Sequence, residues 1–207
     1  MPFSLKRGEL TGAAAHLYIP TRRKARHYAD TFSHALFLAK RLGAHHGAQF
    51  AWDMAGEVAA LLPAGADLVA APPPSHAGTW YFARELAVAV SDKSGIALGR
   101  PLRWAVTGQE ASKAIVHQGG KGRALGRWAE CLEDLTGRRV VIVDDLYTTG
   151  ITAQLTADAL REVGAEVLGV VALALTEPTR ARPDCERRRL EVTQWRIRTR
   201  RARTCCP

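Results

Sequence analysis

Residues 140–152 constrain the fold more than any other part of the chain. Four consecutive aliphatic residues, 140–143, are followed by two aspartates and then by a turn rich in threonine and glycine. An uninterrupted aliphatic run is typical of a strand buried on both faces, as in a parallel sheet covered by helices. A similar run over 166–175 predicts a second such strand, and 152–163 reads as a helix ended by Gly164. This order of strand, helix and strand predicts an α/β fold.

Periodicity and breaking residues predict the remaining elements. In a helix beginning at Thr31, the residues Phe32, Leu36, Phe37 and Lys40 share one face, and Gly43 follows its end. Further helices are predicted over 50–62 and over 79–90, the latter with Thr79 as N-cap and Gly95 beyond its end. Strands are predicted over 14–19, 67–71 and 101–106. We expect a Rossmann-like domain with a parallel sheet of about four or five strands, helices on both faces and a small N-terminal hood.

Composition excludes several classes of protein. The 207 residues are 47% hydrophobic and 24% charged, which is ordinary for a globular domain and excludes disorder throughout the chain. No apolar run approaches the ~18–20 residues that cross a bilayer. The first seven residues lack the basic and then apolar order of a secretion signal. We therefore expect a cytoplasmic protein without membrane contact.

The net charge of +9 is concentrated at one end. Residues 178–207 hold ten arginines and three acidic residues, a net of +7, which leaves +2 for residues 1–177. Only Cys131 of the four cysteines precedes this tail, so no zinc module of cysteine pairs is expected. We predict a disordered tail, for which two interpretations stay open: nonspecific contact with nucleic acid, or no function.

The turn that follows the aliphatic strand at 140–143 has side chains and backbone groups suited to binding a phosphate. Ligands of open α/β sheets lie outside the carboxyl ends of the strands. Thr148, Thr149, Gly150 and Thr152 place hydroxyls and backbone N–H groups at a helix N-terminus, which suits a phosphate monoester. The two aspartates, Asp144 and Asp145, repel that phosphate but suit neighbouring hydroxyls, which donate hydrogen bonds to carboxylates. A phosphate beside a vicinal diol describes a ribose 5-phosphate.

The thirteen residues 140–152 resemble the phosphoribosyl-pyrophosphate (PRPP) motif of type I phosphoribosyltransferases. The form Asp-Asp-x-x-Thr-Thr-Gly is most similar to the ComF-like group, and the resemblance extends over about residues 28–176. It implies that Asp144 and Asp145 bind the ribose hydroxyls as catalytic residues. It further implies 5-phosphate binding by the turn, which comprises Tyr147, Thr148, Thr149, Gly150 and Thr152.

The resemblance also implies a pyrophosphate site in the turn over residues 71–76. That turn contains three prolines and no Arg or Lys, so Ser75 and His76 are its candidate ligands, unless the turn is only a stiff connector. Residues 107–123 hold four glycines and two lysines and resemble the loop that closes over PRPP. Its cations are alternatively ordinary solvated charges. The candidates are Lys113 as a catalytic cation, Lys121 for pyrophosphate, and also His117 and Arg123.

These features predict a function and a domain organisation. We predict a hood over 1–65, a phosphoribosyltransferase core over 66–177 and the basic tail over 178–207. The core is expected to transfer a phosphoribosyl group from PRPP to a nitrogen acceptor with release of pyrophosphate. Mg²⁺ is expected to enter with PRPP, touching the protein through Asp144 and Asp145 only indirectly. The alternative is a weakly catalytic PRPP sensor or a ComF-like protein of DNA uptake. Whether the chain forms a homodimer is left open.

Differences between this sequence and the family motif restrict which acceptors are expected. A threonine, Thr148, occupies the position where 6-oxopurine transferases carry a carboxylate that acts toward the base, which argues against hypoxanthine or guanine. The aromatic run Trp80–Phe82 would either stack on a base or pack in the core. The diol hypothesis would fail if the aspartates were buried in an ion pair, or if the turn faced no cavity.

Overall fold

The computed structural model describes residues 2–7, 9–21, 23–74, 80–106 and 127–177. The strands are β1 Phe3–Arg7, β2 Leu10–Tyr18, β3 Leu68–Ala70, β4 Ala97–Leu98, β5 Arg103–Val106, β6 Arg127–Glu130, β7 Arg139–Tyr147 and β8 Glu166–Thr176. The helices are α1 Lys24–Ala29, α2 Thr31–Arg41, α3 Ala44–Ala59, α4 Phe82–Ser94 and α6 Ile151–Glu162. None of the helices in these ranges is long and apolar enough to cross a membrane.

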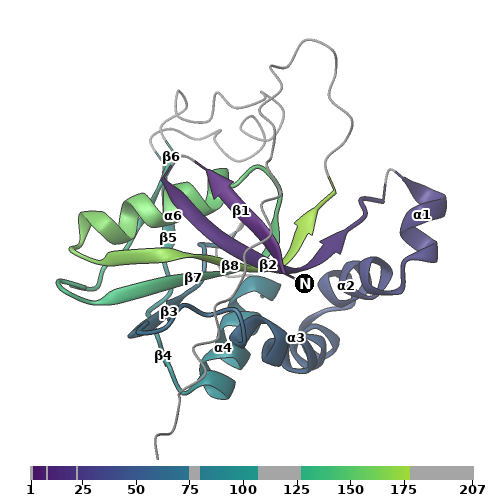
Figure 1. The fold of residues 1–207 in the computed structure, drawn as a ribbon, viewed down its shortest axis with the longest axis horizontal. Helices are drawn as coiled ribbons and strands as arrows, with labels where there is room; N and C mark the ends of the chain where they lie inside the picture. Colours follow the sequence, from purple (N-terminus) through teal and green to yellow (C-terminus); the bar gives the residue numbers. More distant parts are fainter. Residues whose placement is uncertain (1, 8, 22, 75–79, 107–126, 178–207) are drawn as a thin grey trace, which may run out of the picture.

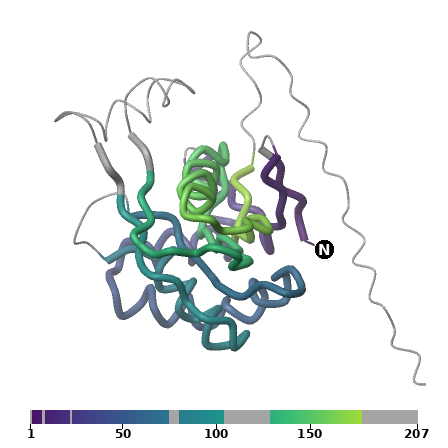
Figure 2. The backbone as a smooth tube through the Cα atoms, turned by 90° about the vertical axis from the view of Figure 1, so that its left-hand side faces the viewer, coloured from purple at the N-terminus to yellow at the C-terminus, as the bar shows by residue number. Residues whose placement is uncertain are grey.

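The main sheet has the strand order β1-β2-β8-β7-β3-β4. The five strands from β2 to β4 in this order are parallel to their neighbours, and β1 pairs with β2 in the antiparallel sense. Helix α6 covers one face of the sheet, and α3 and α4 cover the other (Figures 1 and 2). The predicted α/β class, with a parallel sheet between helices, is confirmed.

Strand β7 shows why its sequence is aliphatic at every position. Val140 and Ile142 pack with α6, whereas Val141 and Val143 pack with α3 and α4. All four side chains are fully buried. Successive side chains of a strand point to opposite faces, so both faces of β7 require apolar residues.

Several predicted boundaries are wrong, among them those of β7, α4 and α3. Strand β7 continues to Tyr147, so the two aspartates lie within the strand and not after it. Helix α4 begins at Phe82 with Tyr81 as its N-cap, three residues later than the predicted start at Thr79. Thr79 itself lies outside the described residues. Helix α3 begins at Ala44 and ends at Ala59, whereas 50–62 was predicted. Local propensity places helix ends poorly where no side chain caps them, and neither of these helices has a side-chain cap.

The sequence patterns did not predict strands β1, β4 and β6, whereas the strand predicted over 101–106 is present as β5. Strand β1 was missed because it is a five-residue edge strand with charged residues at its end. Strand β5 pairs with β6 in a separate two-stranded antiparallel sheet, and so the predicted strand over 101–106 does not belong to the main sheet. Strands β5 and β6 flank residues 107–126, which lie outside the described residues.

The N-terminal third of the chain shares its packing with the rest. Strand β2 lies beside β8, and α3 packs along α4. Residues of both helices, including Val58 and Leu86, belong to one buried cluster under β7 and β8. The division into a hood over 1–65 and a core over 66–177 stays a prediction, and the tail over 178–207 lies outside the described residues.

Candidate functional site

The two aspartates and the threonine turn lie together at the carboxyl end of β7. The strand carries Asp144 and Asp145, and three residues after Tyr147 connect it to α6. Parallel strands β8 and β3 flank β7, so this edge is where an open α/β sheet forms its binding site.

The turn opens onto the N-terminus of α6. Gly150 is the N-cap and has φ = 72°, a left-handed conformation that a residue with a Cβ adopts at a cost of about 1–2 kcal/mol. No side chain caps the helix, and its first turn holds no acidic residue. The first N–H groups of α6 therefore remain available to an anion, and the helix dipole favours it. A cavity of about 90 Å³, lined by Asp144 and residues 146–153, faces this end of the helix.

A larger cavity of about 300 Å³ adjoins the small one. Asp144, Leu146 and Thr152 line both, so the two cavities meet along these residues. The other residues lining the larger cavity come from α2, from the turn after β3, from the start of α4 and from β7: Lys40, Pro72, Pro73, Trp80, Tyr81, Phe82, Ala83 and Asp145. The small cavity suits a phosphate and the larger one the rest of an extended ligand.

Burial and a neighbouring charge alter the acidity of Asp144. Its side chain is 8% exposed, and one of its oxygens accepts the N–H of Asp145 at 2.8 Å. Burial, and then repulsion from the Asp145 carboxylate, raise the pKa of Asp144 to about 7, although Lys40 opposes the shift. A hydroxyl donor that binds here satisfies a carboxylate held in an unfavourable environment.

Lys40 forms an ion pair with Asp145 that the sequence analysis did not predict. Its Nζ lies 2.8 Å from Asp145 Oδ2, and the two side chains are 36% and 14% exposed. Burial disfavours the ammonium ion, but the carboxylates of Asp145 and Asp144 outweigh this effect and raise the pKa of Lys40. Asp145 points to this helix because it continues the face of Val141 and Val143, which packs against α2–α4.

This ion pair bears directly on the diol hypothesis. Burial of the aspartates in an ion pair is one of the two conditions under which that hypothesis fails, and the condition is met for Asp145, whose side chain is 14% exposed. However, Lys40 and Asp145 both line the larger cavity, and the turn faces the small one. A ligand that donates hydroxyls to Asp145 must therefore share this carboxylate with the ammonium group.

The turn residues differ in exposure. Thr148 and Thr149 are exposed, and the hydroxyl of Thr148 lies 2.9 Å from that of Thr176 at the end of β8. Tyr147 lines the small cavity, but its side chain is 3% exposed and belongs to the core under α6. Any phosphate contact from this residue would therefore use its backbone.

The aromatic run divides between core and cavity. Phe82 is 2% exposed and belongs to the buried cluster of α2–α4, yet it also lines the larger cavity beside Trp80 and Tyr81. The hydroxyl of Tyr81 donates to the carbonyl of Pro72 at 2.6 Å, which ties α4 to the proline turn. Burial raises the pKa of Tyr81 to about 12, so this hydroxyl stays protonated.

Several predicted site residues cannot be placed. Those of the proline turn and of the segment between β5 and β6 lie outside the described residues: Ser75, His76, Lys113, His117, Lys121 and Arg123. In the described part of the chain, no group of three or more His, Cys, Asp or Glu side chains could hold a metal ion. The two aspartates are the carboxylates of the described cavity lining, and two carboxylates suit a Mg²⁺ ion held mainly by ligand oxygens.

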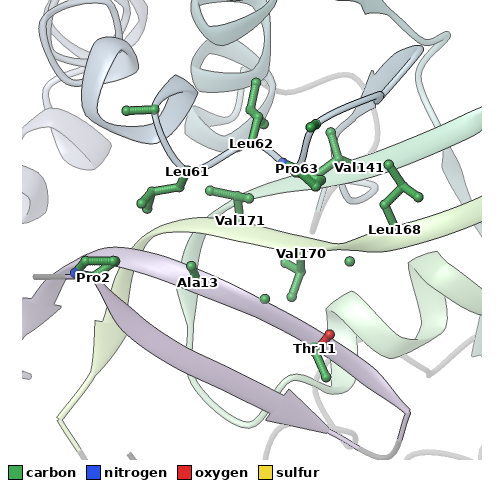
Figure 3. A pocket seen from close by; sticks show the side chains of 14 residues that line it. Pro2, Thr11, Ala13, Leu61, Leu62, Pro63, Val141, Leu168, Val170 and Val171 are labelled. Carbon is green, nitrogen blue, oxygen red and sulfur yellow. The ribbon is translucent and has the colours of Figure 1, made fainter. Parts of the chain in front are cut away.

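A separate apolar cavity of about 430 Å³ lies toward the amino ends of the parallel strands (Figure 3). Residues from β2, β7 and β8 line it together with residues 60–64. Thr11 contributes its one polar side chain, and neither aspartate reaches it. This cavity has no group that could act on a phosphorylated sugar.

Comparison with known proteins agrees with the site. Residues 102–197 match the family described as "Phosphoribosyl transferase domain". Over 69 residues, the chain is 38% identical to an orotate phosphoribosyltransferase of Streptomyces avermitilis, covering 33% of this chain and 37% of that protein. Over 62 residues, it is 45% identical to an orotate phosphoribosyltransferase of Bacillus cytotoxicus, covering 30% of this chain and 26% of that protein. The chain thus matches about a third or less of the length of these relatives.

Among solved structures, a purine phosphoribosyltransferase from Pyrococcus horikoshii is 21% identical, with 68% of this chain and 80% of that chain covered and a TM-score of 0.42. The chain is thus similar to phosphoribosyltransferases over residues 102–197, just under half of its length, and to orotate phosphoribosyltransferases over shorter stretches. These similarities support the predicted resemblance to phosphoribosyltransferases over the matched residues.

Proposed function

We propose that the protein is a phosphoribosyltransferase that binds PRPP and transfers its phosphoribosyl group to a nitrogen acceptor, releasing pyrophosphate. The observation that carries the proposal is the junction of the two cavities at Asp144, Leu146 and Thr152. The 5-phosphate would bind the N–H groups of the turn and of α6, and the ribose hydroxyls would donate to Asp144 and Asp145. Pyrophosphate and acceptor would share the larger cavity.

Mg²⁺ suits this arrangement as a partner of the substrate. It would neutralise the pyrophosphate leaving group, and the two aspartates would contact it directly or through water. The protein itself would act mainly by positioning PRPP and by excluding water from the sugar carbon that reacts.

The test of PRPP binding is a calorimetric titration with Mg²⁺ and PRPP. The parent should bind, and a double variant with Asp144→Asn and Asp145→Asn should not. A matched control is Asp92→Asn, because Asp92 is an exposed aspartate on α4 outside both cavities. Equal binding by the parent and the double variant would refute the proposed site.

The acceptor requires a separate experiment. Orotate is the first compound to test because the curated relatives are orotate phosphoribosyltransferases. Thr148 stands where 6-oxopurine transferases carry a carboxylate that acts toward the base, and its hydroxyl lies beside that of Thr176. The missing carboxylate argues against hypoxanthine and guanine as acceptors. Release of pyrophosphate from PRPP should be measured with orotate, adenine, hypoxanthine and simple amines. Release with none of them would favour the alternative of a PRPP sensor.

A second candidate function rests on the tail. Its net charge of +7 over 178–207 suits nonspecific binding to a phosphate backbone, as expected for a ComF-like protein associated with DNA. Deletion of 178–207 should then abolish retention on DNA, and raised salt should weaken retention of the full chain. Salt-insensitive retention after the deletion would exclude this role. Membership of the ComF-like group and a cytoplasmic location likewise stay predictions, and a homodimer stays an open alternative.

A further inference from the structure

The larger cavity has an uneven charge distribution. Its described lining contains two carboxylates, from Asp144 and Asp145, and one cationic side chain, that of Lys40. The prolines that approach from the turn after β3, Pro72 and Pro73, carry no charge and no N–H group. A pyrophosphate group in this cavity would therefore face two negative charges, and Lys40 is the described group able to offset them.

Lys40 is held at the cavity by its helix. Asp30 caps α2 by accepting the N–H of Ser33 at 2.8 Å, and the Ser33 hydroxyl accepts the N–H of Ile19 beyond the end of β2 at 2.9 Å. Leu36 and Ala39 are buried on the face that leads to Lys40. The helix therefore presents the ammonium group at a fixed place, and not as a freely moving surface charge.

The ammonium group can serve a ligand without leaving Asp145. An ammonium group has three N–H donors, and Asp145 Oδ2 at 2.8 Å accounts for one of them. The side chain is 36% exposed and lines the cavity, so other donors can reach a ligand oxygen. When ribose hydroxyls bind Asp145, they compete with Lys40 for its oxygens and release further donors to the pyrophosphate.

We propose that Lys40 binds the pyrophosphate group of PRPP and exchanges with the ribose hydroxyls as the partner of Asp145. This proposal rests on the proposed function and assigns to α2 the cation that the proline turn lacks. Lys40 would be a binding residue for the leaving group, and it would couple occupation of the sugar site to charge at the pyrophosphate site.

The experiment measures two ligands separately by calorimetry: inorganic pyrophosphate without divalent metal, and ribose 5-phosphate. Lys40→Met keeps most of the length of the side chain and removes its charge. It should weaken pyrophosphate binding at least tenfold and change ribose 5-phosphate binding much less. Arg41→Met is the matched control, because Arg41 follows Lys40 on α2 but lies over the Phe37 ring and outside the cavity. Circular dichroism would verify that each variant is folded.

Asp145→Asn provides a signature of opposite sign. It frees the ammonium group, so it should strengthen pyrophosphate binding severalfold while weakening ribose 5-phosphate binding. Removal of any acid nearby would also favour an anion, but that gain would persist without Lys40. The gain in the Lys40→Met background should therefore be clearly smaller than in the parent background.

The outcomes distinguish the two levels of the proposal. Unchanged pyrophosphate affinity in Lys40→Met, or an equal gain from Asp145→Asn in both backgrounds, would overturn the role of Lys40 and leave PRPP binding standing. A parent protein that binds neither ribose 5-phosphate nor PRPP would overturn the proposed function, and the role of Lys40 with it.

Discussion

Replacement of Asp144 by Asn should stabilise the fold, and the gain should depend on pH. The pKa of Asp144 rises from an ordinary 3.8 to about 7 through burial and repulsion by Asp145. Because one pKa unit corresponds to about 1.4 kcal/mol, full ionisation of this carboxyl in the fold costs at most about 4 kcal/mol. Asn fills the same space without this cost.

The direction follows from the protons bound in each state. Below about pH 4 the carboxyl is protonated in both the native and the unfolded chain, and it costs nothing. Between about pH 4 and pH 7 the unfolded chain has lost this proton and the native protein keeps it, so the contribution of Asp144 to stability is lost as the pH rises. Above about pH 7 the native carboxyl is ionised and the whole cost is present.

Urea unfolding at two pH values measures this effect. The stability of Asp144→Asn relative to the parent should rise by up to about 3 kcal/mol between about pH 5 and pH 8.5, the part of the shift that lies in that window. Asp92→Asn, at an exposed position on α4, should show no such change. A pH-independent difference for Asp144→Asn would mean that Asp144 is ionised throughout, and that its environment imposes no cost.

Three further changes test the site and the packing of the elements around it. Gly150→Ala places a Cβ at φ = 72°, which costs about 1–2 kcal/mol of conformational free energy in the turn. It should lower the affinity for ribose 5-phosphate, measured by calorimetry, about tenfold. Unchanged affinity would argue against phosphate binding at this turn. Tyr81→Phe removes the 2.6 Å bond to the Pro72 carbonyl and should lower the free energy of unfolding by about 1 kcal/mol in urea titrations; an unaltered midpoint would show that this bond contributes nothing net. Glu177→Gln weakens the ion pairs to Arg23 and Arg26 and should speed amide hydrogen exchange in α1 but not in the middle of β8; equal exchange in α1 would show that packing alone holds this helix.

The parts of the fold that the sequence predicts well are those in which local pattern and tertiary context agree. Strand β7 is aliphatic at successive positions because both of its faces are buried, and Gly95 takes the left-handed conformation with φ = 71° that ends α4. Strand β1 follows a different rule, because an edge strand in this sheet needs only Leu5 fully buried and tolerates Lys6. Pattern alone does not reveal that such a segment pairs with β2.

The candidate site shows the same division between local and long-range information. The turn is encoded within residues 147–152, since its glycine conformation and its helix follow one another directly in the sequence. The partner of Asp145 comes from a residue more than one hundred positions earlier, and no local pattern specifies that pairing. One signal did exist: Lys40 falls on the same helical face as Phe32 and Leu36. A charge on an apolar face requires a buried partner or a cavity, and here it has both, because unpaired charge is costly beside a hydrophobic core. A lysine on an apolar helix face therefore indicates an acidic partner elsewhere in the chain and does not contradict the predicted helix. The adjacent aspartates of β7 are the first candidates for that partner.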